Sequence, residues 1–163
     1  MDKFIITIEG FQLTQADFLI RLLVSIGIGA IIGLEREHAA LNDKMKNFAG
    51  IRTFIFVVIL GFVGGMMYFL FNPFVYIGVL FAVVVLTGLS YFVTASKGEI
   101  GATTEFSIII SFFLGTLCLM GKLDISLAIM VVVVVLLTAK FKFQSIVGKI
   151  TGEEFYDFIR FVV

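Results

Sequence analysis

The sequence is poor in the residues that build disulfides, zinc sites and catalytic centres. Its only cysteine, Cys118, stands inside an apolar run, so thiols can form neither a disulfide framework nor a zinc site. It contains no nucleophile beside a base, no glycine-rich phosphate loop and no set of His and Cys ligands. We therefore expect no enzymatic activity and no bound cofactor.

Net charge is absent as well. The 163 residues carry 12 basic and 12 acidic side chains, and this balance points to no nucleic acid or other polyanion as partner. Residues 1–17 lack both a basic stretch and a small-residue cleavage site, so we predict no removable signal peptide. Pro73, the only proline, stands in a short Asn72-Pro73 connection that separates two predicted helices.

The sequence is rich in long apolar runs. Hydrophobic residues make up 60% of the chain and the mean hydropathy is +1.14, more than a soluble domain of this size can cover. A bilayer core needs about 20 apolar residues per helix. Runs near that length cover residues 18–34, 53–71, 74–94, 106–120 and 125–139. These runs predict an all-α integral membrane protein with about five transmembrane helices in a compact bundle.

Lysine and arginine fall mostly on one side of this predicted bundle. With connections alternating across the membrane, one side receives Arg36, Lys44, Lys46, Arg52, Lys97, Lys140, Lys142, Lys149 and Arg160. The other side receives only Lys3, Arg21 and Lys122. The positive-inside rule then places the N-terminus outside and the C-terminus in the cytoplasm.

The chain divides into three parts on this interpretation. Residues 1–17 form an outer N-terminal segment and residues 18–139 a transmembrane domain. Residues 140–163 are basic and aromatic, which fits either an interfacial segment or the start of a further membrane module. The abrupt apolar end of this part favours a natural chain that continues beyond residue 163.

Small residues recur every fourth position on three of the predicted helices. Close backbone approach along such stripes drives helix association in lipid. The stripes are Ser25, Gly29 and Gly33 on the first helix, Gly61 and Gly65 on the second, and Ser107, Ser111 and Gly115 on the fourth. Internal packing of one bundle is the interpretation we favour, and a subunit interface is the alternative. Five short helices enclose little volume, so a solute pathway would lie at an interface between two protomers, and we expect a homodimer. We expect the fifth helix, which lacks a stripe, to face lipid.

Charged and hydroxyl side chains gather at the predicted cytoplasmic helix ends. They are Glu35, Arg36 and Glu37 after the first run, Arg52 and Thr53 at the second, and Thr103, Thr104 and Glu105 at the fourth. Charges near membrane depth commonly pair or mark an ion pathway. Glu35 and Glu105 are the candidates for Mg²⁺, which uses one or two carboxylates; the competing interpretation is neutralisation of both acids by Arg36 and Arg52.

Three motifs in this polar region resemble the signature of the MgtC/SapB family of bacterial inner-membrane proteins. They are GLEREH at 33–38, AGIRTF at 49–54 and GATTEF at 101–106. The matched positions are Gly33, Leu34, Glu35, Arg36, Glu37, Ala49, Gly50, Arg52, Thr53, Gly101, Thr103 and Thr104. The chain departs from the family pattern where Phe54 replaces a common histidine and Glu105 a small apolar residue. Better-known members carry a small soluble C-terminal domain, for which we expect no room in residues 140–163.

The resemblance implies a multi-pass protein of the bacterial inner membrane linked to magnesium or other cation homeostasis. One hypothesis is a cation transporter component, with Glu35, Glu37 and Glu105 attracting the ion and Arg36 and Arg52 organising the acids. The alternative is a non-transporting regulator that docks on another membrane complex through its Gly and Ser stripes. The sequence leaves the ion open.

Overall fold

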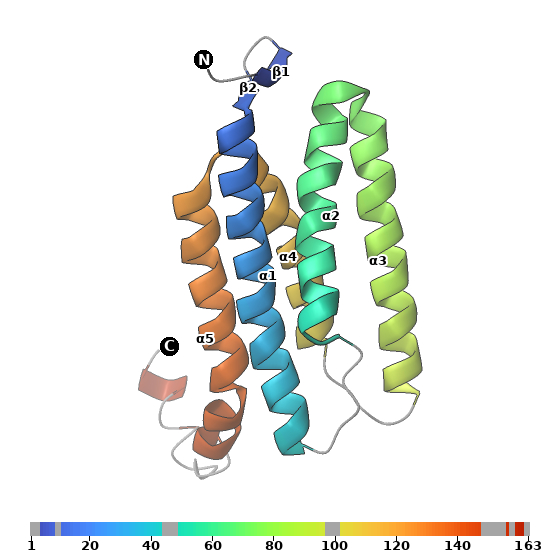
Figure 1. The fold of residues 1–163 in the computed structure, drawn as a ribbon. Helices are drawn as coiled ribbons and strands as arrows, with labels where there is room; N and C mark the ends of the chain where they lie inside the picture. Colours follow the sequence, from blue (N-terminus) through green and yellow to red (C-terminus); the bar gives the residue numbers. More distant parts are fainter. Residues whose placement is uncertain are drawn as a thin grey trace.

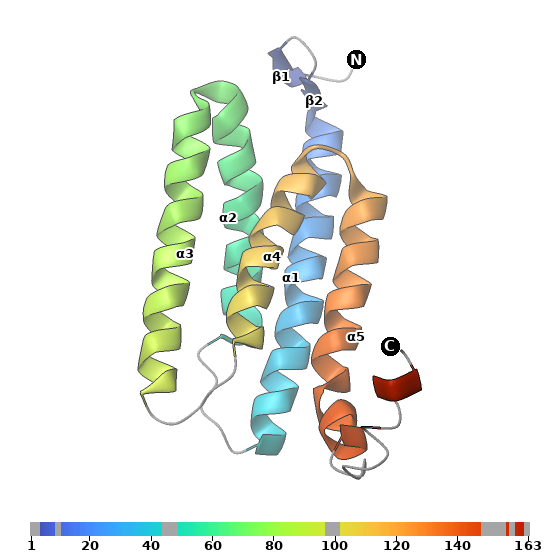
Figure 2. The same cartoon turned by 180° about the vertical axis from the view of Figure 1, so that it is seen from behind.

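The computed structural model describes residues 4–8, 11–43, 49–96, 102–147, 156 and 159–161, and these form a short β-hairpin followed by five helices. The hairpin pairs β1 (Phe4–Ile8) with β2 (Phe11–Thr14) in antiparallel register. The helices are α1 (Gln15–Asp43), α2 (Ile51–Leu70), α3 (Pro73–Ala95), α4 (Thr103–Leu119) and α5 (Leu123–Val147). Figures 1 and 2 show them side by side as one bundle, with the hairpin at one end.

Local sequence signals explain where several helices begin. The Thr14 hydroxyl accepts a hydrogen bond from the Asp17 backbone N–H (3.1 Å) and donates one to the Asp17 carboxylate (2.9 Å), which caps α1. The Asn72 side chain accepts from the Phe74 backbone N–H (2.9 Å), and Pro73 occupies the first turn of α3. The sequence therefore directs the tight antiparallel connection between α2 and α3.

Helix α4 ends in a turn that requires glycine. Gly121 has a φ of 76°, in the left-handed region that residues other than glycine rarely adopt. Its backbone N–H bonds to the carbonyl oxygen of Cys118, and that of Lys122 bonds to Leu117, both at 3.0 Å. These are the paired bonds of a Schellman motif, and they turn the chain directly into α5.

Helix α2 occupies the centre of the bundle. It packs most extensively against α4 and α1, while α3 lies on its outer side and contacts α4 less. Helix α5 packs against α1 and α4, as the two views in Figures 1 and 2 agree. The side chains of Phe54, Phe62 and Phe112 are fully buried in the core between these helices.

The glycine stripes lie inside this bundle. A Cβ added at Gly61 would overlap the carbonyl oxygen of Phe112, and one at Gly115 would overlap that of Val58, so α2 and α4 touch backbone to backbone. Gly29 faces α2 in the same way, since its Cβ would lie 2.7 Å from the Ile55 Cα. Internal packing therefore accounts for the stripes, in agreement with the interpretation favoured from the sequence.

The fifth helix, which we expect to face lipid, is exposed on one face and buried on the other. Val131, Val132, Val135 and Leu136 are exposed, but Ser126, Met130, Val133 and Leu137 are buried where α5 meets α1 and α4. Ser126 sits close enough to α4 for its hydroxyl to reach the Leu114 carbonyl oxygen at 3.4 Å.

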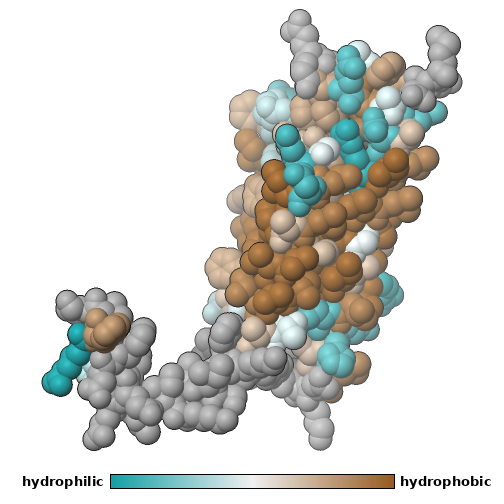
Figure 3. All heavy atoms as spheres, turned by 90° about the vertical axis from the view of Figure 1, so that its left-hand side faces the viewer, coloured by the Kyte–Doolittle hydropathy of each residue, from teal (hydrophilic) through white to brown (hydrophobic). Residues whose placement is uncertain are grey.

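Three helices are long and apolar enough to cross a membrane. They are α1, over Gln15–Leu41, α2 and α3, whereas Thr103–Leu119 and Leu123–Ala139 are apolar but shorter. Figure 3 shows a continuous hydrophobic band on one face, with hydrophilic residues toward both ends. The all-α multi-pass architecture is therefore confirmed, while the count of five spans and the orientation stay predictions.

Candidate functional site

The polar side chains predicted to gather do come from one end of the bundle. The distal part of α1 carries Glu35, Arg36 and Glu37, and the first turns of α2 and α4 lie at the same end (Figure 1). Helix α1 continues to Asp43, well past the apolar run, because the residues after Leu34 include no glycine or proline to stop it. The acids and Arg36 are therefore fixed on a helix.

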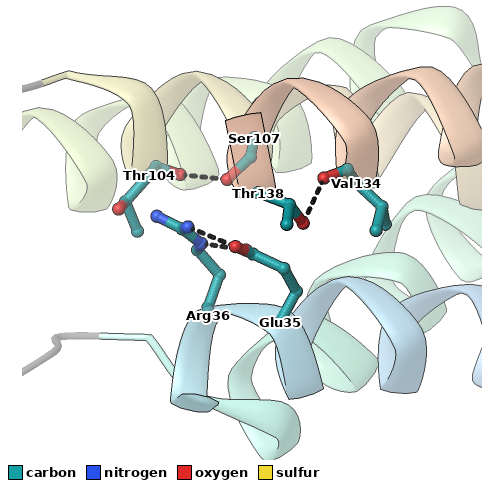
Figure 4. Close-up of polar contacts among 6 residues, drawn as sticks. All are labelled: Glu35, Arg36, Thr104, Ser107, Val134 and Thr138. Atoms are coloured by element: carbon teal, nitrogen blue, oxygen red, sulfur yellow. Dashed lines mark hydrogen bonds and ion pairs between the residues drawn. The ribbon is translucent and has the colours of Figure 1, made fainter. Parts of the chain in front are cut away.

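Glu35 and Arg36 form a two-pronged ion pair within α1. The Arg36 Nε donates to Glu35 Oε2 (2.6 Å) and its Nη2 donates to Glu35 Oε1 (2.8 Å). The side chains are only 13% and 6% exposed. Both point from α1 into the space between α4, which carries Thr104 and Ser107, and α5, which carries Thr138 (Figure 4).

This geometry favours neutralisation by an arginine over metal binding as the interpretation of Glu35. A buried carboxylate is tolerated only when a partner compensates its charge, and the paired bonds to a guanidinium are the strongest such arrangement. Arg36, rather than an ion, supplies that charge. Glu35 is a poor first ligand for Mg²⁺ while this pair is closed.

Glu37 ties α1 to the start of α2. Its Oε2 accepts a hydrogen bond from the backbone N–H of Ile51 (3.1 Å), the first residue of α2. Gly50 makes room for this contact, because a Cβ there would lie 2.8 Å from the same oxygen. The N-cap residue of α2 is Gly50, which has no side chain to cap the helix. Glu37 takes this role, because it places a negative charge at the helix N-terminus and accepts from a backbone N–H that lacks a partner within the helix.

The hydroxyl groups of Ser107, Ser111 and Thr116 on α4 are satisfied by backbone carbonyl groups. Ser107 donates to the Thr104 carbonyl oxygen and Ser111 to that of Ser107, both at 2.7 Å. Thr116 donates across the bundle to the carbonyl oxygen of Gly61 on α2 (2.9 Å). These groups stabilise helices and helix contacts, and they leave little hydrogen-bonding capacity for a hydrated path.

The remaining predicted members of the cluster are not joined to the ion pair. Arg52 and Thr103 are exposed, and Thr53 is half-buried. Glu105 is half-buried, and its Oε2 is a buried atom without a hydrogen-bond partner. Among the described residues Arg52 forms no ion pair with Glu105, so neutralisation of this second acid by Arg36 and Arg52 stays a prediction.

The described part of the chain likewise brings no group of several acids together as a metal site. Among the described residues, no three His, Cys, Asp or Glu side chains lie close enough to hold one ion. Glu35 is engaged by Arg36 and Glu37 by the start of α2. The predicted Mg²⁺ candidates, Glu35 and Glu105, thus differ: Glu35 has its countercharge and Glu105 has an oxygen without a partner.

Sequence reasoning gave two polar residues no site role. Arg21, expected from the sequence to reach the outer interface or to pair with Asp17, donates from Nη1 to the Leu119 carbonyl oxygen (2.6 Å) at the end of α4 and lies against Gly121. It therefore compensates a helix C-terminus. Ser90 on α3 is 7% exposed, and its hydroxyl has no partner. Its position on the inner face of α3, three residues after Thr87, is the signal that could have identified it.

Comparisons with known proteins locate the chain in one family. The family model described as the MgtC family matches residues 22–146, which include α2, α3, α4 and most of α1 and α5. No curated protein and no solved structure matches the chain. With the match extending over all three motifs and the helices that hold them, the chain belongs to the MgtC family.

Proposed function

We propose that this multi-pass membrane protein serves magnesium or other cation homeostasis as a regulator of another membrane complex. Membership of the MgtC family supports the link to cation homeostasis. The choice of a regulator over a conducting protein rests on one observation, which is the closed packing of the core beyond the polar end.

Beyond the ion pair, the buried polar side chains Ser25, Ser107 and Ser111 already donate their hydroxyl groups to backbone carbonyl oxygens. Phe54, Phe62 and Phe112 are each 0% exposed. The approach of α2 to α4 at Gly61 and Gly115 leaves no space for even a methyl group. An ion that entered at the polar end would have to lose its hydration against aromatic rings, which is prohibitively costly. This packing supports a protomer that does not conduct.

The structure changes how such a regulator would meet its partner. The Gly and Ser stripes are used for contacts inside the bundle, so docking through them is no longer part of the proposal. Helix α3 is the better candidate, because it packs mainly on α2 and exposes Phe81, Leu89 and Phe92. A partner complex would bind these side chains within the bilayer.

Glu37 provides the cation-responsive element in this proposal. Its Oε2 bonds the Ile51 N–H at the start of α2, and it lies at an exposed position that an ion can reach. Mg²⁺ binds proteins through one or two carboxylates while keeping several waters. The ion and the Ile51 N–H therefore compete for the same carboxylate, and binding would loosen the tie between α1 and α2.

Hydrogen exchange measures this competition directly. We expect Mg²⁺ to speed exchange of the Ile51 amide in the reconstituted protein, and we expect Glu37→Gln to abolish the Mg²⁺ effect. The Phe74 amide, which bonds to Asn72 at the start of α3, is the internal control and should not respond. Exchange at Ile51 that ignores Mg²⁺ would refute the proposed response.

Proteoliposomes test the regulator against the transporter. We expect no uptake of Mg²⁺ or competing cations by the wild-type chain under an imposed gradient. Uptake that disappears in Glu35→Gln would overturn the proposal and place Glu35 on a cation route. Counting photobleaching steps in the same vesicles tests the proposed homodimer, for which two steps are expected.

A further inference from the structure

A groove of about 420 Å³ lies between α2 and α3, with α4 behind it. Its lining is apolar apart from Thr53 and Thr87, and Ile108 of α4 contributes to it. Phe56 and Leu86 line it while remaining 70% and 62% exposed. The volume falls within the range of about 300–1,000 Å³ typical of ligand sites. Figure 2 shows the three helices that form it.

Three polar residues lie within one helical turn of lining residues, all at the same end of the groove. Arg52 precedes Phe56 by four residues on α2, and Glu105 precedes Ile108 by three on α4. Ser90 follows Thr87 by three residues on α3, which runs the opposite way. Residues three or four apart share a helix face. The groove therefore has an apolar length and one polar end with a cation, a hydroxyl and a carboxylate.

Two of these polar groups have an atom that is buried without a partner. Ser90 Oγ and Glu105 Oε2 are the buried side-chain oxygens or nitrogens that lack a hydrogen bond in the described part of the chain. The neighbouring hydroxyl of Thr87 does have a partner, because it donates to the Val83 carbonyl oxygen at 2.7 Å. Native structures seldom leave buried polar atoms unpaired, and such atoms often mark a site for an absent partner.

The length of the groove matches half a bilayer. Its lining on α2 extends from Thr53 to Val63, which at about 1.5 Å per residue is about 15 Å. The hydrocarbon core of a membrane is about 30 Å thick, so a single leaflet accounts for about 15 Å. An acyl chain from one leaflet fits this length, with its headgroup at the end marked by Arg52, Ser90 and Glu105.

We propose that the groove binds one acyl chain of a phospholipid whose headgroup carries both a phosphate and a primary ammonium, as in phosphatidylethanolamine. The ammonium has N–H donors for the two unpaired oxygens, Glu105 Oε2 and Ser90 Oγ. Arg52, which is exposed at this end, would supply a guanidinium group for the phosphate. A choline headgroup has no N–H donors, and a glycerol headgroup brings no cation to Glu105. The site therefore selects ethanolamine lipids over both.

Quenching by brominated acyl chains measures this selectivity. The chain contains no tryptophan, so Phe56→Trp places a single reporter in the groove, and Phe81→Trp places one on α3 at a lipid-facing position outside it. Each variant is reconstituted in phosphatidylcholine vesicles with increasing fractions of brominated phosphatidylethanolamine, phosphatidylglycerol or phosphatidylcholine. We expect phosphatidylethanolamine to be preferred at the groove reporter about tenfold, as one charge-assisted hydrogen bond predicts, and not at the other reporter.

Variants in the Phe56→Trp background assign the preference to its residues. Glu105→Gln should abolish it, and Ser90→Ala should reduce it, while Asp124→Asn, which changes an exposed carboxylate at the opposite end of α4 and α5, should leave it unchanged. Circular dichroism confirms that each variant is folded. Equal quenching by the three lipids at both reporters would overturn the proposal. So would a preference for phosphatidylglycerol, or a preference that survives both Glu105→Gln and Ser90→Ala.

Discussion

Alanine in place of Gly61 tests whether backbone contact between α2 and α4 holds the bundle together. The new Cβ would overlap the Phe112 carbonyl oxygen, and no rotamer change can relieve a clash with backbone. The two helices must separate, whereas ordinary contacts at a Cβ begin at 3.4 Å. Separation also stretches the Thr116–Gly61 hydrogen bond of 2.9 Å, which crosses the same contact.

The expected change in the free energy of unfolding is the sum of opposing effects. Overpacking costs about 1–3 kcal/mol and a clash with backbone belongs at the upper end. The lost interhelical hydrogen bond adds about 0.6 kcal/mol in lipid. Alanine is intrinsically more helical than glycine by about 1 kcal/mol, which offsets part of the loss. We therefore expect Gly61→Ala to lower the free energy of unfolding by about 2–3 kcal/mol.

Other glycines supply a graded series on the same scale. The Cβ of Gly29→Ala would meet backbone at 2.7 Å, so an intermediate loss of about 1 kcal/mol is expected. At Gly65 the nearest atom is a Leu119 methyl carbon at 2.9 Å, which can rotate away, so little change is expected. Gly78 has nothing within 4 Å, and Gly78→Ala should stabilise by up to about 1 kcal/mol.

Reversible unfolding by SDS in mixed micelles, followed by circular dichroism, gives these free energies. From least to most stable, we expect the variants in the order Gly61→Ala, Gly29→Ala, Gly65→Ala and Gly78→Ala. Equal stability of Gly61→Ala and Gly78→Ala would refute the backbone contact. In that case the small residues would have to serve an interface between protein chains.

Three further substitutions test individual contacts by the same unfolding assay. Arg21→Gln should cost about 1–2 kcal/mol by releasing the Leu119 carbonyl at the end of α4, and an unchanged stability would argue against that bond. Asn72→Ala should cost about 1 kcal/mol through loss of the α3 cap, whereas Asn72→Ser should retain most of it. Glu37→Ala should cost about 0.5–1 kcal/mol at the start of α2, and the loss should shrink in high salt because the site is exposed.

Sequence patterns predicted the helices from their apolar runs, and residues with strong local preferences mark two of the connections. Asn72 and Pro73 separate α2 from α3, and Gly121 separates α4 from α5. The hairpin was not predicted, because two strands of four and five residues carry a weak periodic signal. Tertiary contacts stabilise it: Leu13 is 0% exposed, and Phe11 stacks on Phe69 of α2 with ring centres 4.2 Å apart.

The site was predicted less completely, because sequence spacing does not reveal which polar groups meet. Glu35 and Arg36 are adjacent, and adjacent residues on a helix point in directions about 100° apart, so a pair is not expected from spacing. They meet because both side chains bend into the space between α4 and α5 (Figure 4). The contact between Glu37 and Ile51 likewise depends on how α1 lies against α2, which no local pattern encodes.

Some polar groups near the three motifs have hydrogen-bond partners within the bundle, and others do not. Glu35 and Glu37 both have partners supplied by the bundle itself. Ser90 and Glu105 do not, and each unpaired buried atom costs about 1–3 kcal/mol unless a ligand compensates it. Ser90 lies outside all three motifs, and Glu105 stands where the family pattern has a small apolar residue. If the cost at these two residues is offset by a lipid headgroup, the groove beside α3 belongs to the particular role of this chain, whereas GLEREH and AGIRTF mainly join α1 to α2.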